Sequence, residues 1–172
     1  VAFNPLDRPP GIAPAVVAGS VLEIFKRQWQ DVSWGPELES ILRASLMVLA
    51  QVPGQSLVSL WQMLVDEPFR DALLKQVEDE WLRAYWECKI GQWSKKLWQE
   101  AVKSSLNKIE QFVSSPILRN ILGQPHGKLR MRAAMDERRI VLANLSKGAL
   151  SSDTSLVLGA LFVAATKQSA MS

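Results

Sequence analysis

The chain has 172 residues, 48% of them hydrophobic, and its single cysteine and single histidine exclude a disulfide framework and a Cys/His zinc cluster. Its net charge of +3 is unevenly divided: residues 1–86 carry 7 Lys and Arg against 11 Asp and Glu, whereas residues 87–172 carry 13 against 6. An acidic half joined to a basic half predicts two faces with different partners, the basic one meeting nucleic acid; a solvated surface of uneven charge is the alternative.

Apolar residues recur at helical spacing through most of the chain, and prolines or capping residues mark where helices begin. Ser56 and Asp66 have the side chains that favour the position before a helix. The predicted helices are Pro14–Trp29, Pro36–Gln51, Leu57–Leu64, a fourth beginning at Glu67, Pro116–Leu122, a short turn of helix over Arg130–Met135, and Thr154–Ala170.

The longest periodic stretch is Glu78–Val113, whose apolar residues lie close to one stripe. It can form a single helix of about 54 Å at 1.5 Å per residue. Gly91 is a plausible kink, so a broken pair of helices is the alternative.

Two short segments have the pattern of strands. Ile140–Leu145 is apolar, is preceded by charge and is closed by Ser-Lys-Gly, and Phe3–Leu6 is a short extended piece. Because a lone strand cannot satisfy its backbone groups, we expect these segments to be the two ends of a sheet in a larger α/β protein from which the chain was excised. The predicted fold class is therefore mostly α: a helical bundle with at most a small β remnant.

No catalytic motif is complete in the chain, and we therefore predict that it is not an enzyme. Gly123–Leu129 has three residues between its glycines where a phosphate-binding loop needs four, and Leu129 stands where that loop needs Ser or Thr. Leu60–Glu67 ends like a Mg²⁺-binding strand, but its helical spacing makes Asp66 a helix cap. Neither a nucleophile–base pair nor a metal site can be assembled from the remaining residues.

Cationic residues gather in two places in the basic half. Lys96 and Lys103 are seven positions apart and lie on nearly the same helical face, and such a row can follow a phosphate backbone without reading bases. The alternative is a solvated helix face. The candidate nucleic-acid-binding residues are Lys95, Lys96, Lys103, Lys108, Arg130 and Arg132.

Five of the seven tryptophans occur on or beside apolar helical stripes. We expect them to pack in the core or between helices, with a platform for base stacking as the alternative. They are Trp61, Trp81, Trp86, Trp93 and Trp98.

In their order and spacing, several segments together resemble the inserted helical region of conjugative coupling-protein ATPases, the TraG/TraD-like members of the HerA/FtsK superfamily. The resemblance covers essentially the whole chain. Its segments are Phe3–Leu6, a helix ending near Trp29, Ile41–Arg43, Leu64–Arg70, Pro116–Gln124, Ile140–Gly148 and Leu158-Gly159.

The resemblance implies an all-helical domain, residues 14–136, inserted in a RecA-like ATPase core whose hexamer pumps DNA. Residues 1–8 would be a remnant of a core strand, and residues 137–172 would be a strand and helix that return to the core. Partners implied are DNA, a relaxase or other secreted substrate, accessory proteins and the parent ATPase core. ATP and Mg²⁺ would be held by parent segments absent here, so no cofactor is expected in this chain.

The longest apolar run, Leu156–Thr166, is shorter than the roughly 20 residues that cross a bilayer, so we expect no membrane contact. We expect a cytoplasmic location, with the parent anchored at the inner membrane. One rival function is a pure protein-interaction module that docks a relaxase or accessory protein through apolar or acidic surface. The acidic residues concerned are Glu37, Glu39, Asp71 and Glu78–Glu80. Another rival is the equivalent domain of a HerA-type DNA translocase outside conjugation.

Overall fold

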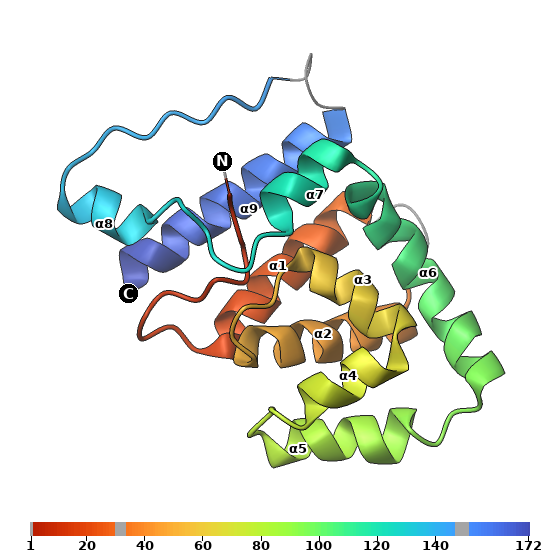
Figure 1. The fold of residues 1–172 in the computed structure, drawn as a ribbon. Coiled ribbons are helices and arrows are strands. Elements are labelled where there is room, and N and C mark those ends of the chain that lie inside the picture. Colours follow the sequence, from red (N-terminus) through yellow and green to blue (C-terminus); the bar gives the residue numbers. More distant parts are fainter. Residues whose placement is uncertain (1, 30–33, 147–151) are drawn as a thin grey trace.

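The protein is described by a computed structural model that covers residues 2–29, 34–146 and 152–172, and these residues form a mostly helical bundle (Figure 1). The predicted return segment 137–172 therefore falls partly outside the described residues. The described helices are α1 (Pro14–Trp29), α2 (Pro36–Gln51), α3 (Leu57–Val65), α4 (Glu67–Leu74), α5 (Glu80–Ala84), the π-helix η1 (Tyr85–Ile90), α6 (Lys95–Val113), α7 (Pro116–Leu122), α8 (Met131–Asp136) and α9 (Ser152–Met171).

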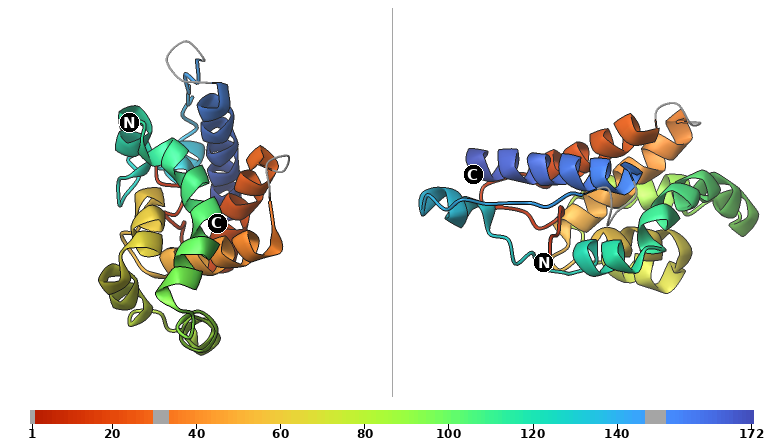
Figure 2. Two further views of the ribbon diagram at one scale, coloured as in Figure 1. Left: turned by 90° about the vertical axis from the view of Figure 1, so that its right-hand side faces the viewer. Right: turned by 90° about the horizontal axis from the view of Figure 1, so that it is seen from above.

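Helix α1 is the centre of the bundle. It packs against α2 on one side and α9 on the other, and α6 crosses the edge formed by α2 and α3 (Figures 1 and 2). Large side chains fill the space between these helices, among them Phe25, Leu42 and Leu161, which are almost fully buried. No helix within the described residues is both long enough and apolar enough to cross a membrane.

The predicted helix starts at Ser56 and Asp66 are confirmed. Ser56 begins α3 in a reciprocal capping arrangement in which its backbone N–H donates to the hydroxyl of Ser59 at 3.1 Å. The Asp66 carboxylate accepts the backbone N–H of Phe69 at 3.1 Å and so caps α4. Asp66 is thus a helix cap, and the apolar run before it is helical.

The stretch Glu78–Val113 is not a single helix. It divides into α5 with η1, a turn after Gly91, and α6. The N–H of Gly91 donates to the carbonyl of Trp86 five residues earlier, which closes the π-helix, and the hydroxyl of Ser94 caps α6 by accepting the N–H of Leu97. The alternative of a helix broken near Gly91 is the correct one.

The prediction of a strand at Ile140–Leu145 is wrong for the described structure, in which none of the described residues forms a strand. The segment runs beside α9 (Figures 1 and 2), and the side chains of Ile140 and Leu142 are 89% and 91% exposed. Leu145 packs against the core. The apolar residues of this segment favour burial in a sheet, but none of the described residues forms a second strand with which it could pair.

Phe3–Leu6 is not a strand either, and it is anchored to the bundle by side-chain contacts and by a backbone bond from the Phe3 N–H to the carbonyl of Ile121 at 3.0 Å. The buried amide of Asn4 donates to the carbonyls of Gln55 and Pro125, each at 2.8 Å. Its oxygen accepts the backbone N–H of Leu6 at 3.0 Å. Phe3 and Leu6 are buried in the same core as the helices.

Arg138 ends α8 in the left-handed region, with a φ of +53°. Its N–H donates to the carbonyl of Met135 at 3.1 Å, and the N–H of Arg139 donates to that of Ala134 at 2.8 Å. This pair of bonds is the Schellman ending, in which the position of Arg138 is ordinarily glycine. The ending turns the chain from α8 toward the segment at Ile140.

Glu39 joins α1 to α2. Its carboxylate accepts hydrogen bonds from Lys26 and Trp34, both at 2.8 Å, and from Arg43 at 2.9 Å. These three donors lower the pKa of Glu39 from 4.5 to about 2, against a smaller opposing effect of burial.

Candidate nucleic-acid interface

A groove of about 350 Å³ runs between α6 and the pair α3–α4. One wall is a polar row on α6, because Lys95, Gln99, Lys103 and Asn107 recur every four residues and all line the groove. Lys95 and Lys103 are eight positions apart, which is about 12 Å along the helix axis. The groove therefore pairs Lys103 with Lys95, and not with Lys96 as the predicted row had it, and two amide side chains lie in the same line.

The opposite wall supplies a third cation, Arg70 of α4. Its guanidinium donates to the carbonyl of Met63 at 3.2 Å, and its Cζ lies 4.9 Å from the ring centroid of Trp98. Burial lowers the pKa of Arg70, while the nearby Asp71 and Glu67 act in the opposite direction. An arginine remains charged at neutral pH. The contact with Trp98 of α6 holds this half-buried cation facing that helix.

Trp98 fixes the distance between the two walls. Its indole N–H donates to the carbonyl of Leu64 at 3.1 Å, and its ring meets those of Trp86 and Trp93 at centroid distances of 6.0 and 6.3 Å. Two of these tryptophans bridge helices as predicted: Trp86 is buried, and Trp98 packs against the core. The groove is therefore backed by a cluster of three tryptophan rings.

Carboxylates lie at two places on the groove wall, Glu67 and Glu110. Glu110 already accepts the indole N–H of Trp61 at 3.3 Å, seven positions beyond Lys103 on α6. The cationic part of the groove is consequently the part bounded by Lys95, Lys103 and Arg70.

The other candidate residues are not brought into this groove. Lys96 is exposed on α6 but does not line it, and Lys108 points into the bundle, where it is only 5% exposed. The Lys108 ammonium donates to the Ser104 hydroxyl at 3.2 Å, and burial lowers its pKa. A buried ammonium cannot meet a phosphate unless α6 moves.

Arg130 and Arg132 lie at α8, across the molecule from α6 (Figures 1 and 2). Both are exposed, and Arg132 binds Asp136 at 2.9 Å and the carbonyl of Ser172 at 2.8 Å. The six candidate residues therefore divide into three near the α6 groove, one buried lysine and a separate pair.

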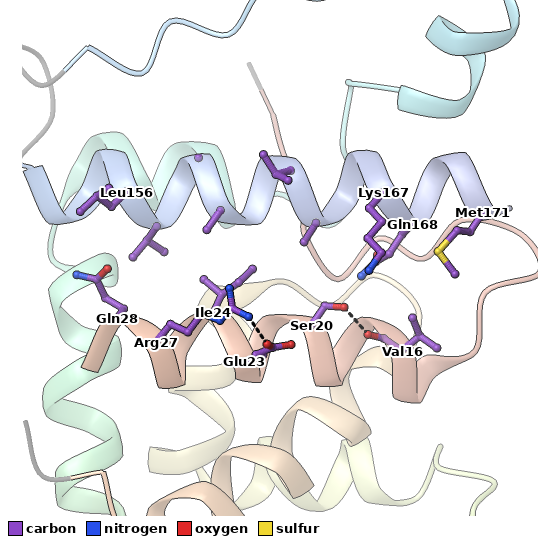
Figure 3. Close-up of a pocket in the computed structure, with 15 residues that line it drawn as sticks. Val16, Ser20, Glu23, Ile24, Arg27, Gln28, Leu156, Lys167, Gln168 and Met171 are labelled. Atoms are coloured by element: carbon purple, nitrogen blue, oxygen red, sulfur yellow. Dashed lines mark hydrogen bonds and ion pairs between the residues drawn. The ribbon is translucent and has the colours of Figure 1, made fainter. Parts of the chain in front are cut away.

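A larger groove of about 570 Å³ separates α1 from α9 (Figure 3). Its walls are mostly apolar, and α9 contributes Leu156, Val163 and Met171, all exposed. The ion pair between Glu23 and Arg27, 2.6 Å long, lies along the α1 wall. The groove combines this apolar contact area with polar side chains from both helices: Ser20, Glu23, Arg27, Gln28, Lys167 and Gln168.

Sequence reasoning missed Arg70, Gln99 and Asn107. The spacing of Gln99 and Asn107 from the two lysines would have identified them, whereas Arg70 comes from a different helix and carries no local signal. The described residues contain no group of three or more His, Cys, Asp or Glu side chains placed to hold a metal ion. Comparisons with protein-family models, curated proteins and solved structures find no match for this chain.

Proposed function

We propose that this chain engages DNA through the α6 groove, as the substrate-contacting helical domain of a type IV secretion coupling protein. The observation that carries the proposal is the convergence of Lys95, Lys103 and Arg70 from two helices on one groove. Cationic side chains can bind the phosphate backbone of DNA without contacting the bases. Gln99, between the two lysines, and Asn107, after them, add neutral hydrogen-bond donors.

The net charge of residues 87–172 and the segment order described above support the same proposal. In it the ATP and Mg²⁺ of the parent DNA-translocating ATPase are held outside this segment, and the segment itself does not hydrolyse nucleotide. The equivalent domain of a HerA-type translocase outside conjugation would use the groove in the same way.

Fluorescence anisotropy of labelled single- and double-stranded DNA, titrated with the chain at 50 and 200 mM salt, tests the proposal. Three phosphate contacts give a slope of about −2.7 for duplex DNA in log affinity against log salt, so we expect affinity to fall by about 40-fold across this range. Single-stranded DNA should lose about 20-fold.

The double variant Lys95→Glu with Lys103→Glu should abolish binding. The matched control is Arg130→Glu with Arg132→Glu, which makes the same charge change at α8 and should leave binding in place. Binding lost only in the control would move the interface to α8. No binding by the unaltered chain at 50 mM salt, or rapid nucleotide hydrolysis by it, would contradict the proposal.

A further inference from the structure

Trp81 is the one exposed tryptophan among the seven, all of which are described, and its side chain is 72% exposed. It was predicted to pack inside the bundle, and that prediction is wrong. Trp81 stands on α5, toward the end of the molecule away from α9 (Figures 1 and 2). A large amphipathic ring in this position is typical of protein-binding surfaces.

The Trp81 ring is held in place by its neighbour. It stacks on Tyr85 with centroids 5.6 Å apart and planes inclined by 29°. The Tyr85 hydroxyl shares a 2.6 Å hydrogen bond with that of Ser40, and the Lys89 ammonium lies 5.1 Å from the centre of the same ring. Tyr85 is thus fixed to α2, and Trp81 presents a ring already ordered before any partner arrives.

A hollow of about 240 Å³ opens beside this pair, between α1, α2 and α5. Most of its lining residues are small or apolar, among them Ala18, Gly19, Ala44, Met47 and Leu82, and its polar lining comes from Ser40, Arg43 and Asp79. Pockets for drug-sized ligands are typically about 300–1,000 Å³, so this one suits a single apolar side chain.

The surroundings of the hollow are acidic. Glu78, Asp79 and Glu80 are consecutive, Glu78 and Glu80 are exposed, and Asp79 lines the hollow while capping α5 through the N–H of Leu82. Three cations belong to the same region: Arg43 lines the hollow and binds Glu39 at 2.9 Å, Lys89 lies over Tyr85, and Arg83 stands on α5. Carboxylates at this density repel phosphates and attract Lys and Arg.

We propose that Trp81 and the hollow beside it bind a basic peptide segment of a partner protein, one apolar side chain entering the hollow while flanking Lys or Arg residues meet Glu78 and Glu80. The three observations that carry this assignment are the ordered exposed ring, a hollow of single-side-chain size and a rim of opposite charge. The site is distinct from the α6 groove.

Selection of a random heptapeptide phage library on the immobilised full chain tests the assignment, followed by anisotropy with a labelled synthetic peptide of the enriched sequence. Enriched peptides should carry one aromatic or aliphatic residue beside Lys or Arg. Replacing that residue by Ala, or the flanking residues by Glu, should abolish binding. Failure to enrich any peptide, or enrichment of sequences without basic residues, would overturn the proposal.

Two variants of the chain locate the site. Trp81→Ala should weaken the synthetic peptide by about 30-fold, which is the effect of losing an anchor residue. Gly19→Leu should fill the hollow and weaken binding similarly without unfolding the chain, because an added Cβ at Gly19 meets nothing within 4 Å and leucine favours helix.

Charge variants separate this site from the DNA groove. Glu80→Lys should weaken the peptide, whereas Glu100→Lys on α6 is the matched control and should not. The double variant Lys95→Glu with Lys103→Glu should leave peptide binding unchanged. Peptide binding that survives both Trp81→Ala and Gly19→Leu would refute the assignment, and a chain that dimerises through Trp81 would show that the occupant is a second copy.

Discussion

Replacing Lys108 by methionine should stabilise the fold. The Lys108 ammonium has three donors, yet the described structure gives it one hydrogen bond, to the hydroxyl of Ser104. It stands on α6, which packs against α2 and α3, and only 5% of the residue is exposed. Methionine keeps the length of the side chain and removes the charge.

The size of the gain follows from two opposing effects. Burying a polar group with incomplete hydrogen bonding costs about 1–3 kcal/mol, and the bond to Ser104 returns about 1 kcal/mol. We therefore expect Lys108→Met to raise the free energy of unfolding by about 1 kcal/mol. For a chain of this length that corresponds to about 2–4 °C in Tm.

The pH dependence gives a second readout. Burial lowers the folded-state pKa of Lys108 below its unfolded value, so the unfolded chain binds more protons and stability rises with pH in this range. The penalty is fully present below the folded pKa and is relieved as pH approaches about 10.4, the unfolded value. The advantage of Lys108→Met should consequently shrink between neutral pH and about pH 10.

The assay is thermal unfolding followed by circular dichroism at pH 7 and pH 9.5, combined with DNA anisotropy. Lys103→Met is the matched control: it should change stability by less than about 0.5 kcal/mol, because Lys103 is exposed, but it should weaken DNA binding. The reasoning fails if Lys108→Met destabilises the chain, or if it weakens DNA binding as much as Lys103→Met does.

Three further substitutions test other parts of the fold. The depressed pKa of Glu39 contributes stability above pH 4.5 that is lost as pH falls through about 2. Because its two charged partners, Lys26 and Arg43, are exposed, Glu39→Gln should cost only about 1 kcal/mol, seen by urea unfolding at pH 7 but not at pH 2, with Glu37→Gln as a neutral control. Arg138→Gly should add about 1 kcal/mol in the same assay by removing a left-handed non-glycine residue, and an unchanged midpoint would argue against strain at that residue. Gly123→Ala should destabilise the chain by about 1–3 kcal/mol, seen as a lower Tm, because the added Cβ would lie 2.4 Å from a backbone carbonyl oxygen. Gly35→Ala is the control and should leave the Tm unchanged, because its added Cβ meets nothing within 4 Å.

The sequence predicted the helices best where two signals agreed. Pro14–Trp29 and Pro36–Gln51 have the predicted bounds, because a proline in the first turn fixes the start and apolar periodicity continues to the end. In Glu78–Val113 the apolar periodicity continues through the turn between η1 and α6, so it gives no sign that the helix is broken there. Ser94, which caps α6, was the overlooked local signal.

The strand at Ile140–Leu145 was mistaken for a different reason. Apolar, β-branched residues indicate that a segment favours burial in a sheet, but pairing also needs a neighbouring strand, which the local sequence does not specify. Within the described residues that neighbour is absent, and Ile140 and Leu142 remain in solvent. At the other end, the buried amide of Asn4 and a backbone bond from the Phe3 N–H to the carbonyl of Ile121 hold Phe3–Leu6 in place of sheet pairing, and the sequence around Asn4 carries no local signal of that role.

The candidate site was half predictable. Lys108 follows Lys103 by five positions, which places it about 140° around the helix at 100° per residue, so its orientation toward the core could have been calculated. Arg70 could not have been found in this way, since its approach to Trp98 depends on how α4 packs against α6. Local spacing gives the face of a helix, but only packing gives the residues opposite it.

The two proposed sites account for the uneven charge of the chain in a way that can be separated by experiment. The α6 groove takes its two lysines from the basic half and its α3–α4 wall, with Arg70, from the acidic half, whereas the Trp81 hollow lies wholly in the acidic half. Both interactions should weaken with salt, so salt dependence alone cannot distinguish them. Substitutions can, because charge reversal at Lys95 and Lys103 acts on DNA while Trp81→Ala acts on the peptide. If each variant impaired both ligands, the surfaces would be coupled and the division by charge would be wrong.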